Sequence, residues 1–314
     1  MSDRPACTVI IPTYNRATLL GHTLASLTRQ SLPADRFEVM VVDDGSSDPT
    51  RAVVGSFSDR LNLRYFFQPD QGFRAAKARN TGIVQATGDV CVLIDCGVLL
   101  HSGCLAAHLA SHAAATDGPV AVCGYVYCFN TDNEEADQMR RVIDVDDLDG
   151  TIARLQRNDW WPDLREEFYA AHTERFHHLP APWLMFWTAN VSAQTGQLRR
   201  VGMFDEAFTR WGGEDLDLGY RLHQDGAKLM VDRRASSIHY PHPKRFADNL
   251  AHAVENYRYI ARKYDTPITR LLAEDGFDDN FFRLNEIIRE RGIPDCADYR
   301  AQTGRAELVQ PEPR

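Results

Sequence analysis

The chain lacks a long hydrophobic run. None of its apolar stretches comes close to the length of about 18 residues that a membrane-spanning helix needs. The first residues, MSDRP, carry no apolar stretch of the kind that marks a secretory signal. We therefore expect a soluble protein of the cytoplasm. The basic amphipathic stretch 244–263 could touch a membrane surface, but packing against the core is the simpler interpretation.

Positive charge is also scarce. The 314 residues include 35 Lys and Arg against 44 Asp and Glu, which gives a net charge of −9. A broad nucleic-acid-binding surface is normally strongly basic, so this balance argues against nucleic acid as a partner. An anionic ligand would need a local positive site within an acidic protein.

The seven cysteines show no pattern of their own. Their number is odd, no two have the C-x-x-C spacing, and several, such as Cys91, lie within apolar runs. These features favour free thiols over a disulfide framework. With 44% apolar and 25% charged residues, the composition is that of an ordinary globular protein with a substantial core.

Short β-branched runs alternate with helical patterns over the first 125 residues. We predict strands at 7–12, 37–42, 61–67, 90–94 and 120–123, and helices at 17–28 and 75–86. Such alternation is typical of a Rossmann-like α/β fold, in which helices flank a mostly parallel sheet. Ligands of these sheets bind beyond the carboxyl ends of the strands, so the polar residues after each strand are candidates for a site.

The rest of the chain is harder to divide. Residues 126–182 interrupt the alternation and predict an insertion with some helix. An apolar run, a Gly-rich loop, a short helix and a strand then follow up to Val231. We predict one domain over 1–243 and a helical extension over 244–314.

Within the extension, a helical pattern begins after Arg245. The residues Leu250, Val254, Tyr257 and Ile260 recur at helical spacing and are expected on one apolar face. The tail beyond 303 is polar and contains proline, a composition typical of disorder.

The loop after the first strand carries groups that suit a nucleotide. Pro12 ends the strand, and Thr13, Tyr14 and Arg16 follow it at the edge of the predicted sheet. The Tyr14 ring can stack on a base, and the Arg16 guanidinium can neutralise a phosphate. The alternative is a plain strand-to-helix turn in which Asn15 caps the helix.

Two adjacent acids end the second strand. Asp43 and Asp44 can accept hydrogen bonds from a base N–H or from a ribose hydroxyl. The alternative is a turn in which Asp48 caps the next helix. Two acids in a row exceed what a turn needs, which favours a binding role.

A glycine and several cations lead into the helix predicted at 75–86. Gly72 lets the backbone turn closely, and Arg74, Lys77 and Arg79 supply positive charge near an expected phosphate site. A solvated basic face of the helix is the alternative.

Asp95 follows the buried strand at 90–94. An acid at this point can face a ribose or a divalent metal, because hard metals prefer oxygen ligands and bridge diphosphate oxygens. One carboxylate alone supplies too few ligands for a complete metal site. His239 or His242, after a later strand-like run, can complete such a site or contact a diphosphate, and both can equally be loop histidines.

The segment from Trp211 to Asp215 is the most informative. In this segment a tryptophan precedes two glycines, Gly212 and Gly213, and several acids. Residues of these types in a row do not suit a packed core. They suit a sugar, because an apolar ring face can stack on indole while carboxylates bind hydroxyl groups. Glu214 or Asp215 starts a helix, and an ionised carboxylate there can take a proton from a hydroxyl. The alternative is a capped helix start.

Together these motifs resemble family 2 glycosyltransferases of the GT-A fold, over about residues 7–243. IPTYNR is similar to the family's opening strand and donor loop, VVDDGSSD to its nucleotide-binding acids, and QGFRAAKARN to its G-x-x-x-A-x-A-R-N run. WGGEDLDLGYRL resembles the acceptor motif shared by chondroitin polymerases, polypeptide N-acetylgalactosaminyltransferases and β-1,4-galactosyltransferases. Four such motifs in this order make a specific resemblance.

The resemblance implies an inverting transferase that moves a hexose from a nucleotide diphosphate sugar, UDP-linked by default, to a hydroxyl of a carbohydrate or small-molecule acceptor. Asp215 would be the general base. The implied donor site consists of Pro12, Thr13, Tyr14, Arg16, Asp43 or Asp44, Gly72, Arg79 and Asp95. The acceptor would be positioned by Trp211, Gly212, Gly213 and Glu214, with a contribution from 126–182. The metal cofactor, Mn²⁺ or Mg²⁺, would be held by Asp95 and His239.

One departure from the family pattern bears on that metal. The family's Asp-x-Asp places a second acid, commonly the direct metal ligand, where this chain has Gly97. Three possibilities follow: the site uses Asp95 and His239 with water, binds a metal mainly through the diphosphate, or works without a metal.

Two other classes of function remain open. One is a nucleotide-sugar-binding protein without catalytic activity, which Gly97 would explain but which the intact pair Glu214 and Asp215 argues against. The other is a nucleotidyltransferase on a related sheet, which requires a Gly-rich basic triphosphate loop that IPTYNR does not provide. Release of a nucleoside diphosphate, of pyrophosphate, or of neither would distinguish the three classes.

Overall fold

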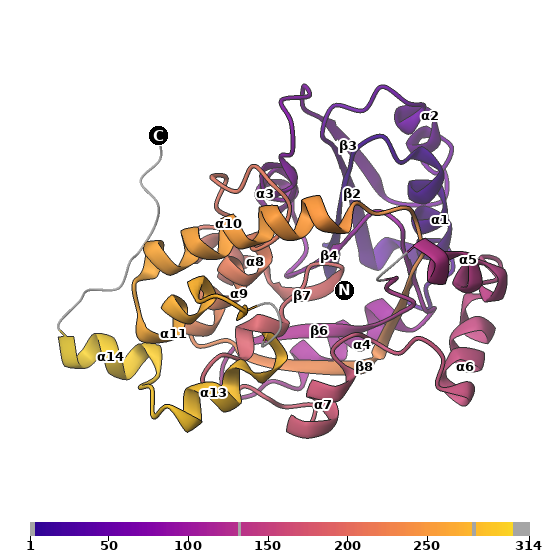
Figure 1. Cartoon of the computed structure of the whole chain (residues 1–314). Coiled ribbons are helices and arrows are strands. Elements are labelled where there is room, and N and C mark those ends of the chain that lie inside the picture. Colours follow the sequence, from indigo (N-terminus) through magenta and orange to yellow (C-terminus); the bar gives the residue numbers. More distant parts are fainter. Residues whose placement is uncertain (1–3, 131–132, 278–280, 304–314) are drawn as a thin grey trace.

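A mixed eight-stranded sheet forms the centre of the protein (Figure 1). The computed structural model describes residues 4–130, 133–277 and 281–303. The strands lie side by side in the order β3-β2-β1-β4-β7-β6-β8-β5. Their bounds are β1 (Cys7–Thr13), β2 (Phe37–Asp43), β3 (Leu63–Phe67), β4 (Val90–Ile94), β5 (Val98–Leu100), β6 (Val120–Tyr127), β7 (Asn190–Gln194) and β8 (Lys228–His239).

The first half of the sheet is parallel. Strands β3, β2, β1 and β4 pair in parallel, as the alternation of strands and helices in the sequence predicts. Strand β7 joins this half to the other, because it pairs antiparallel with both β4 and β6. Strand β6 is parallel to β8, and the short β5 pairs antiparallel with β8 at the edge. The α/β prediction is confirmed, and the antiparallel β7 is an addition to it.

Helices flank the sheet, and a helical C-terminal part follows β8 (Figure 1), which confirms the prediction for that part. Their bounds are α1 (Ala17–Leu27), α2 (Thr50–Gly55), α3 (Ala75–Gln85), α4 (Cys104–Ala113), α5 (Asn133–Val142), α6 (Leu148–Asn158), α7 (Glu166–His172), α8 (Thr195–Arg200), α9 (Glu214–Gln224), α10 (Phe246–Tyr264), α11 (Pro267–Arg270), α13 (Leu284–Glu290) and α14 (Cys296–Thr303). Among the residues that the structure describes, no helix combines the length and the apolar character that crossing a membrane requires.

Side chains that alternate along the strands divide the core into two layers. Val9 and Ile11 of β1 pack in one hydrophobic cluster with apolar residues of α1 and α4, whereas Ile10 packs in the other cluster. Gly82 lets α3 approach β1 closely, because a Cβ atom at this position would lie 2.5 Å from Ile10 Cγ2. The sequences of the central strands are unbroken apolar runs because both faces of the sheet are covered by other parts of the chain.

The polar strand β7 has no counterpart among the predicted strands. Its residues Asn190 and Ser192 are buried and contact the His108 ring of α4 at 2.9 and 2.8 Å. Buried polar side chains leave no apolar period, so the sequence pattern does not predict this strand. Two predicted strand bounds also shift: the strand expected at 61–67 begins at Leu63, and the strand expected at 120–123 continues to Tyr127.

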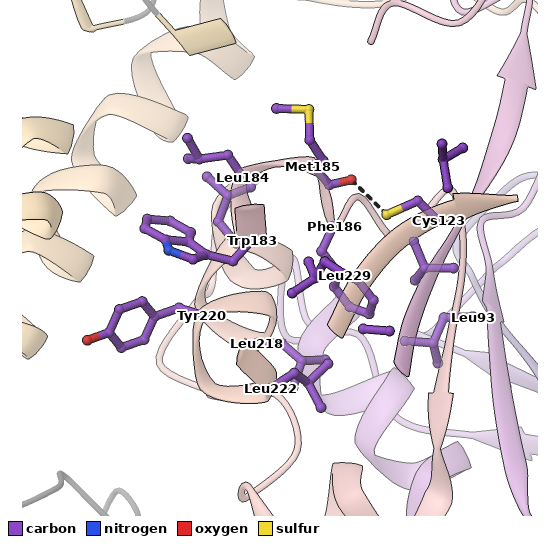
Figure 2. Close-up of a cluster of buried hydrophobic side chains, with 14 of the residues drawn as sticks. Leu93, Cys123, Trp183, Leu184, Met185, Phe186, Leu218, Tyr220, Leu222 and Leu229 are labelled. Carbon is purple, nitrogen blue, oxygen red and sulfur yellow. Dashed lines mark hydrogen bonds between the residues drawn. The ribbon is translucent and has the colours of Figure 1, made fainter. Parts of the chain in front are cut away.

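Helix α9 is attached to the body of the protein by its buried face (Figure 2). Leu218 and Leu222 belong to the same hydrophobic cluster as Phe186 and as Leu229 of β8. Gly219 allows the close contact, because a Cβ atom there would lie 2.9 Å from Phe186 Cβ. This packing determines where the first turn of α9 lies relative to the sheet.

Helix α10 is held against α9 by buried charges. Lys263 Nζ lies 2.7 Å from an Asp205 oxygen and 2.6 Å from an Asp217 oxygen. Tyr264 donates its hydroxyl to Asp217 at 2.7 Å, and Arg221 pairs with the other Asp217 oxygen at 2.7 Å. Buried charges are stable only when paired in this way, so Asp217 holds the two helices together.

The apolar face expected on α10 is correct only in part. Ile260 is buried and Val254 and Tyr257 are partly buried, but Leu250 is 49% exposed because the first turns of α10 extend beyond the core. The tail beyond 303, for which the composition predicts disorder, lies outside the described residues.

We predict that Leu218→Ala lowers the free energy of unfolding by about 2–5 kcal/mol, because it removes buried methyl groups and leaves a cavity. The exposed Leu250 provides the control, and Leu250→Ala should change the free energy by no more than about 0.5 kcal/mol. Urea denaturation followed by circular dichroism measures both values. Equal losses from the two substitutions would contradict the packing described for α9.

Candidate active site

The carboxyl ends of β1, β2 and β4 bring three of the predicted site loops to one edge of the sheet. Thr13 of β1 lies opposite Asp43 of β2, and the Asp44 N–H donates to the Thr13 carbonyl oxygen at 2.8 Å. Asp95 follows β4, which is the neighbour of β1 on its other side. The parallel order of these strands therefore places Tyr14, Asp44 and Asp95 at the same edge.

Local hydrogen bonds shape the loop between β1 and α1. Asn15 has a left-handed φ of 49°, and its Oδ1 accepts the Ser47 N–H at 2.8 Å. Asp48 accepts the N–H of Ala17, the first residue of α1, at 2.8 Å and that of Thr50 at 3.1 Å. Asp48 thus bonds the first residue of both α1 and α2, but the N-cap residue of α2 is Pro49, and Asn15 ties the loop to the turn after β2 instead of capping the helix.

Asp43 and Asp44 have different surroundings. Asp43 accepts the Tyr65 hydroxyl at 2.6 Å and a backbone N–H of its own turn at 2.7 Å, so both of its oxygens are occupied locally. Asp44 accepts the Gln68 side-chain amide at 2.6 Å and the Arg74 N–H at 2.9 Å. Burial raises the pKa of Asp44. Asp44 thereby joins β2 to the segment that leads into α3.

Tyr14 is exposed beside that same segment. Its hydroxyl donates to Asp70 at 2.8 Å, and the Gly72 N–H donates to the other Asp70 oxygen at 2.9 Å. Gly45, with a φ of 95°, allows the approach, because a Cβ atom there would collide with the Asp70 backbone. The predicted donor residues Tyr14 and Gly72 are therefore joined through Asp70, and Asp44 bonds the same segment at Gln68 and Arg74.

Arg79 of α3 lies buried between two acids from distant parts of the chain. Its side chain contacts Asp95 Oδ1 at 2.8 Å and Glu214 Oε1 at 3.1 Å, and the residue is only 4% exposed. The guanidinium carbon lies 5.3 Å from the centre of the Phe204 ring. Because two acids share this one cation, Arg79 joins the end of β4 to the start of α9.

Helix α9 begins directly after a turn that only glycine adopts readily. Gly212 and Gly213 have φ values of 91° and 89°. Asn256 of α10 donates to the Gly212 carbonyl oxygen at 2.6 Å, so α10 holds this turn from outside. Trp211 is 44% exposed, which leaves its indole ring accessible.

Asp215 is half-buried in the first turn of α9. Its carboxylate accepts the Leu216 N–H at 2.9 Å and the Thr188 N–H at 3.4 Å. Burial, followed by the Glu214 charge, raises the pKa of Asp215 to about 7, and the Arg79 charge opposes this rise. A carboxylate with such a pKa can exchange a proton near neutral pH.

Glu214 also has a polar atom that suits a ligand. Its Oε2 is buried and has no hydrogen-bond partner within the described residues. Buried polar atoms are normally bonded, so this oxygen has capacity for a donor from outside the chain.

His239 ends β8 and is 6% exposed. Its ring centre lies 4.7 Å from that of Phe129 and 5.1 Å from that of His242. In the described part of the chain, its Nδ1 is buried without a hydrogen-bond partner. Burial, followed by the positive charge of Lys244, lowers the pKa of His239 well below its ordinary value. The ring is thus neutral in a positively charged environment.

The predicted metal ligands do not form a donor set that fits a tightly held cation. Asp95 is paired with Arg79, and Gly97, the position of the family's second acid, contributes no side chain. Among the described residues, no three side chains of His, Cys, Asp or Glu are grouped so as to hold a metal ion. The His239 Nδ1 atom would suit a metal, but Lys244 is the charged group that acts on it most strongly.

Two residues of this region carry a role that the sequence analysis missed. Asn80 bonds the Phe204 backbone through both its amide atoms, at 2.8 and 2.9 Å, and so anchors the loop that leads to Trp211. Its position next to Arg79 in the Arg-Asn pair was an available signal. Lys244 was noted only within a basic stretch, and no local pattern shows that it lies near Asp95 and Arg16, whose charges act on it.

The sequence matches two family models. Glycosyl transferase family 2 covers residues 8–178, and the N-terminal domain of galactosyltransferase covers residues 170–246. The first model contains the β1, β2 and β4 loops with Arg79, and the second contains the segment from Trp211 to Asp215 as well as His239.

Relatives and solved structures agree with these matches. Validoxylamine A glucosyltransferase of Streptomyces hygroscopicus subsp. jinggangensis is 38% identical over 86% of this chain and 64% of its own length. Chondroitin synthase of Escherichia coli is 30% identical over 75% of this chain and 34% of its own length. The chain thus spans less than two thirds of either relative. The structure of S. aureus TarS 1–349 in complex with UDP-GlcNAc has the same fold, with a TM-score of 0.59 at 18% identity over 88% of this chain and 70% of that one.

The match to the first model extends over more than half of the 314 residues and includes the loops that the sheet brings to one edge. This protein therefore belongs to glycosyl transferase family 2.

Proposed function

We propose that this protein is an inverting glycosyltransferase that moves a hexose from a UDP-linked donor to a hydroxyl group of a carbohydrate or a small-molecule acceptor. The observation that carries the proposal is the Asp215 carboxylate, which is half-buried, has a raised pKa and lies within electrostatic reach of Arg79 and Asp95. The family and the likeness to a glucosyltransferase support sugar transfer. A fold neighbour in complex with UDP-GlcNAc supports a UDP-linked donor.

The donor nucleotide is assigned to the loops after β1 and β2. Tyr14, exposed and oriented by Asp70, would stack on the base, and Asp44 would accept a hydrogen bond from the base or the ribose. Pro12 and Thr13, at the end of β1, would contribute backbone atoms next to Tyr14 and Asp44. Asp43, which is 1% exposed against 6% for Asp44, would support the loop instead of contacting the nucleotide.

The acceptor is assigned to the turn before α9 and to its first residue. The accessible Trp211 ring would stack on the acceptor, and the two glycines allow it to approach the backbone. Glu214 Oε2 would accept a hydrogen bond from an acceptor hydroxyl, since this oxygen is buried without a partner in the described chain. Arg79 holds the Glu214 carboxylate in place.

The proposed reaction is a single displacement. Asp215 takes the proton of the acceptor hydroxyl while the hydroxyl oxygen forms a bond to the anomeric carbon. The bond from that carbon to the diphosphate breaks, and the nucleoside diphosphate leaves with the electron pair. One displacement inverts the anomeric configuration. General-base assistance is worth about 10²–10⁴ in rate, and positioning and charge stabilisation supply the remainder.

We predict that Asp215→Asn lowers kcat by about 10²–10⁴, because an amide cannot act as the base. The dissociation constant of the donor should stay nearly unchanged, since Asp215 does not contact the nucleotide in the proposal. The assay measures release of nucleoside diphosphate from UDP-glucose, UDP-hexosamines and other nucleotide sugars with a panel of acceptors, and calorimetry measures donor binding.

The matched control is Asp225→Asn at the other end of the same helix. Asp225 pairs with Arg200 near the surface and should be dispensable for turnover. Near-normal turnover of Asp215→Asn would show that the base is another group. Release of pyrophosphate in place of nucleoside diphosphate would contradict the reaction class itself.

We also predict an acidic limb in the pH profile. The base acts in its ionised form, so kcat/KM should rise with pH through an apparent pKa of about 7 and fall about tenfold per pH unit well below it. Steady-state rates between pH 5 and pH 9 measure the limb.

Glu214→Gln provides a directional test of that assignment. Removing the Glu214 charge should lower the pKa of Asp215, because the neighbouring negative charge no longer opposes ionisation and Arg79 has one acid fewer to pair with. The acidic limb should therefore move to lower pH, even as weaker acceptor binding reduces the rate. A limb that stays in place would assign the titration to a different group.

A further inference from the structure

The backbone after Asp95 does not suit a second acid. Gly97 has a φ of 99°, a region that residues with a Cβ atom rarely adopt. Its N–H donates to Thr23 Oγ1 at 2.9 Å, and its carbonyl oxygen accepts the Tyr240 N–H at 2.8 Å, so α1 and β8 both hold this conformation. An aspartate at 97 would strain the turn, and the Asp95 carboxylate is already shared with Arg79.

Two basic residues belong to segments that lie close to this turn. Arg16 follows β1 beside Cys96, whose Sγ contacts the Arg16 carbonyl oxygen at 3.8 Å. Lys244 lies in the loop after β8, where its Nζ is 3.1 Å from the Asn130 carbonyl oxygen and 3.4 Å from the centre of the Phe129 ring. The Arg16 backbone therefore lies beside the turn after β4. Lys244 is linked to the same turn through Phe129, because the Phe129 ring contacts His239, which pairs with Val98 of β5.

The charges of this group act on one another. Burial and then the charge of Arg16 lower the pKa of Lys244, whereas the charge of Asp95 raises it. Cations held close together repel each other, and an anion placed between them relieves that repulsion.

We propose that Arg16 and Lys244 bind the donor's diphosphate directly, in place of a divalent cation held by the protein. This inference rests on the proposed function and deepens it, because it names the groups that meet the charge of the leaving diphosphate. The planar Arg16 guanidinium offers paired donors to phosphate oxygens, and the Lys244 ammonium offers a compact charge. Cations fixed in this way stabilise the charge that develops on the leaving group.

The test compares nucleoside diphosphates with their nucleosides. UDP, GDP and dTDP are titrated into the wild-type protein by calorimetry in EDTA and again in Mn²⁺, and the tightest of them is carried forward together with its nucleoside. We expect the dissociation constant of the diphosphate to be the same in EDTA and in Mn²⁺. Lys244→Met should raise that constant by about tenfold or more in EDTA and leave nucleoside binding unchanged, because only the diphosphate contacts the ammonium.

Lys228→Met is the matched control. Lys228 is also a partly buried lysine, lies at the opposite end of β8 and pairs with Asp117, so its loss should change neither affinity. Arg16→Gln should reproduce the selective loss of diphosphate affinity from a different element, and Lys244→Arg should restore most of it. Circular dichroism confirms that each variant is folded.

The outcomes separate the inference from the function it rests on. A nucleoside diphosphate that binds only with Mn²⁺ or Mg²⁺, and equally well to Lys244→Met and Lys228→Met, overturns the inference and leaves the proposed function standing. If none of the three nucleoside diphosphates binds under either condition, the proposed function fails and the inference fails with it.

Discussion

The buried Arg79 guanidinium is the interaction on which the rest of the site depends. A charge that is removed from water must be paired, and Arg79 meets this requirement with Asp95 at the end of β4 and Glu214 at the start of α9. The two acids are separated along the chain by β5, β6, β7 and the helices from α4 to α8. One cation thus sets the separation between the loops of the parallel half-sheet and the turn that carries Asp215.

The same shared cation explains the proton chemistry assigned to Asp215. Arg79 donates a hydrogen bond to Glu214, the neighbour of Asp215. The Arg79 charge lowers the pKa of Asp215, but burial and the Glu214 charge together keep this pKa raised. A base that is ionised only near neutral pH is a stronger proton acceptor than an ordinary exposed carboxylate. Buried polar contacts through Asp217 and Lys263 hold α9, which carries Asp215 in its first turn, against α10.

The segments around the turn after Asp95 carry positive charge. The turn at Gly97, which a larger side chain would strain, removes an acid there, and Arg16 and Lys244 add positive charge. Acids therefore surround the position proposed for the acceptor, and cations surround the position proposed for the phosphates. This separation of charge would allow an acidic protein to bind the proposed anionic donor locally.

The sequence by itself determined the strands of the parallel half and the loops at their ends, because a strand covered on both faces must be apolar and its polar continuation lies at the sheet edge. It also indicated the turn at Gly212 and Gly213 and the acids after it. Only the tertiary structure decided that β7 is polar and antiparallel, that Arg79 pairs with Glu214, and that Lys244 approaches Arg16. These contacts join residues that are 96 or more positions apart, and no local periodicity shows which distant side chain a buried charge will meet.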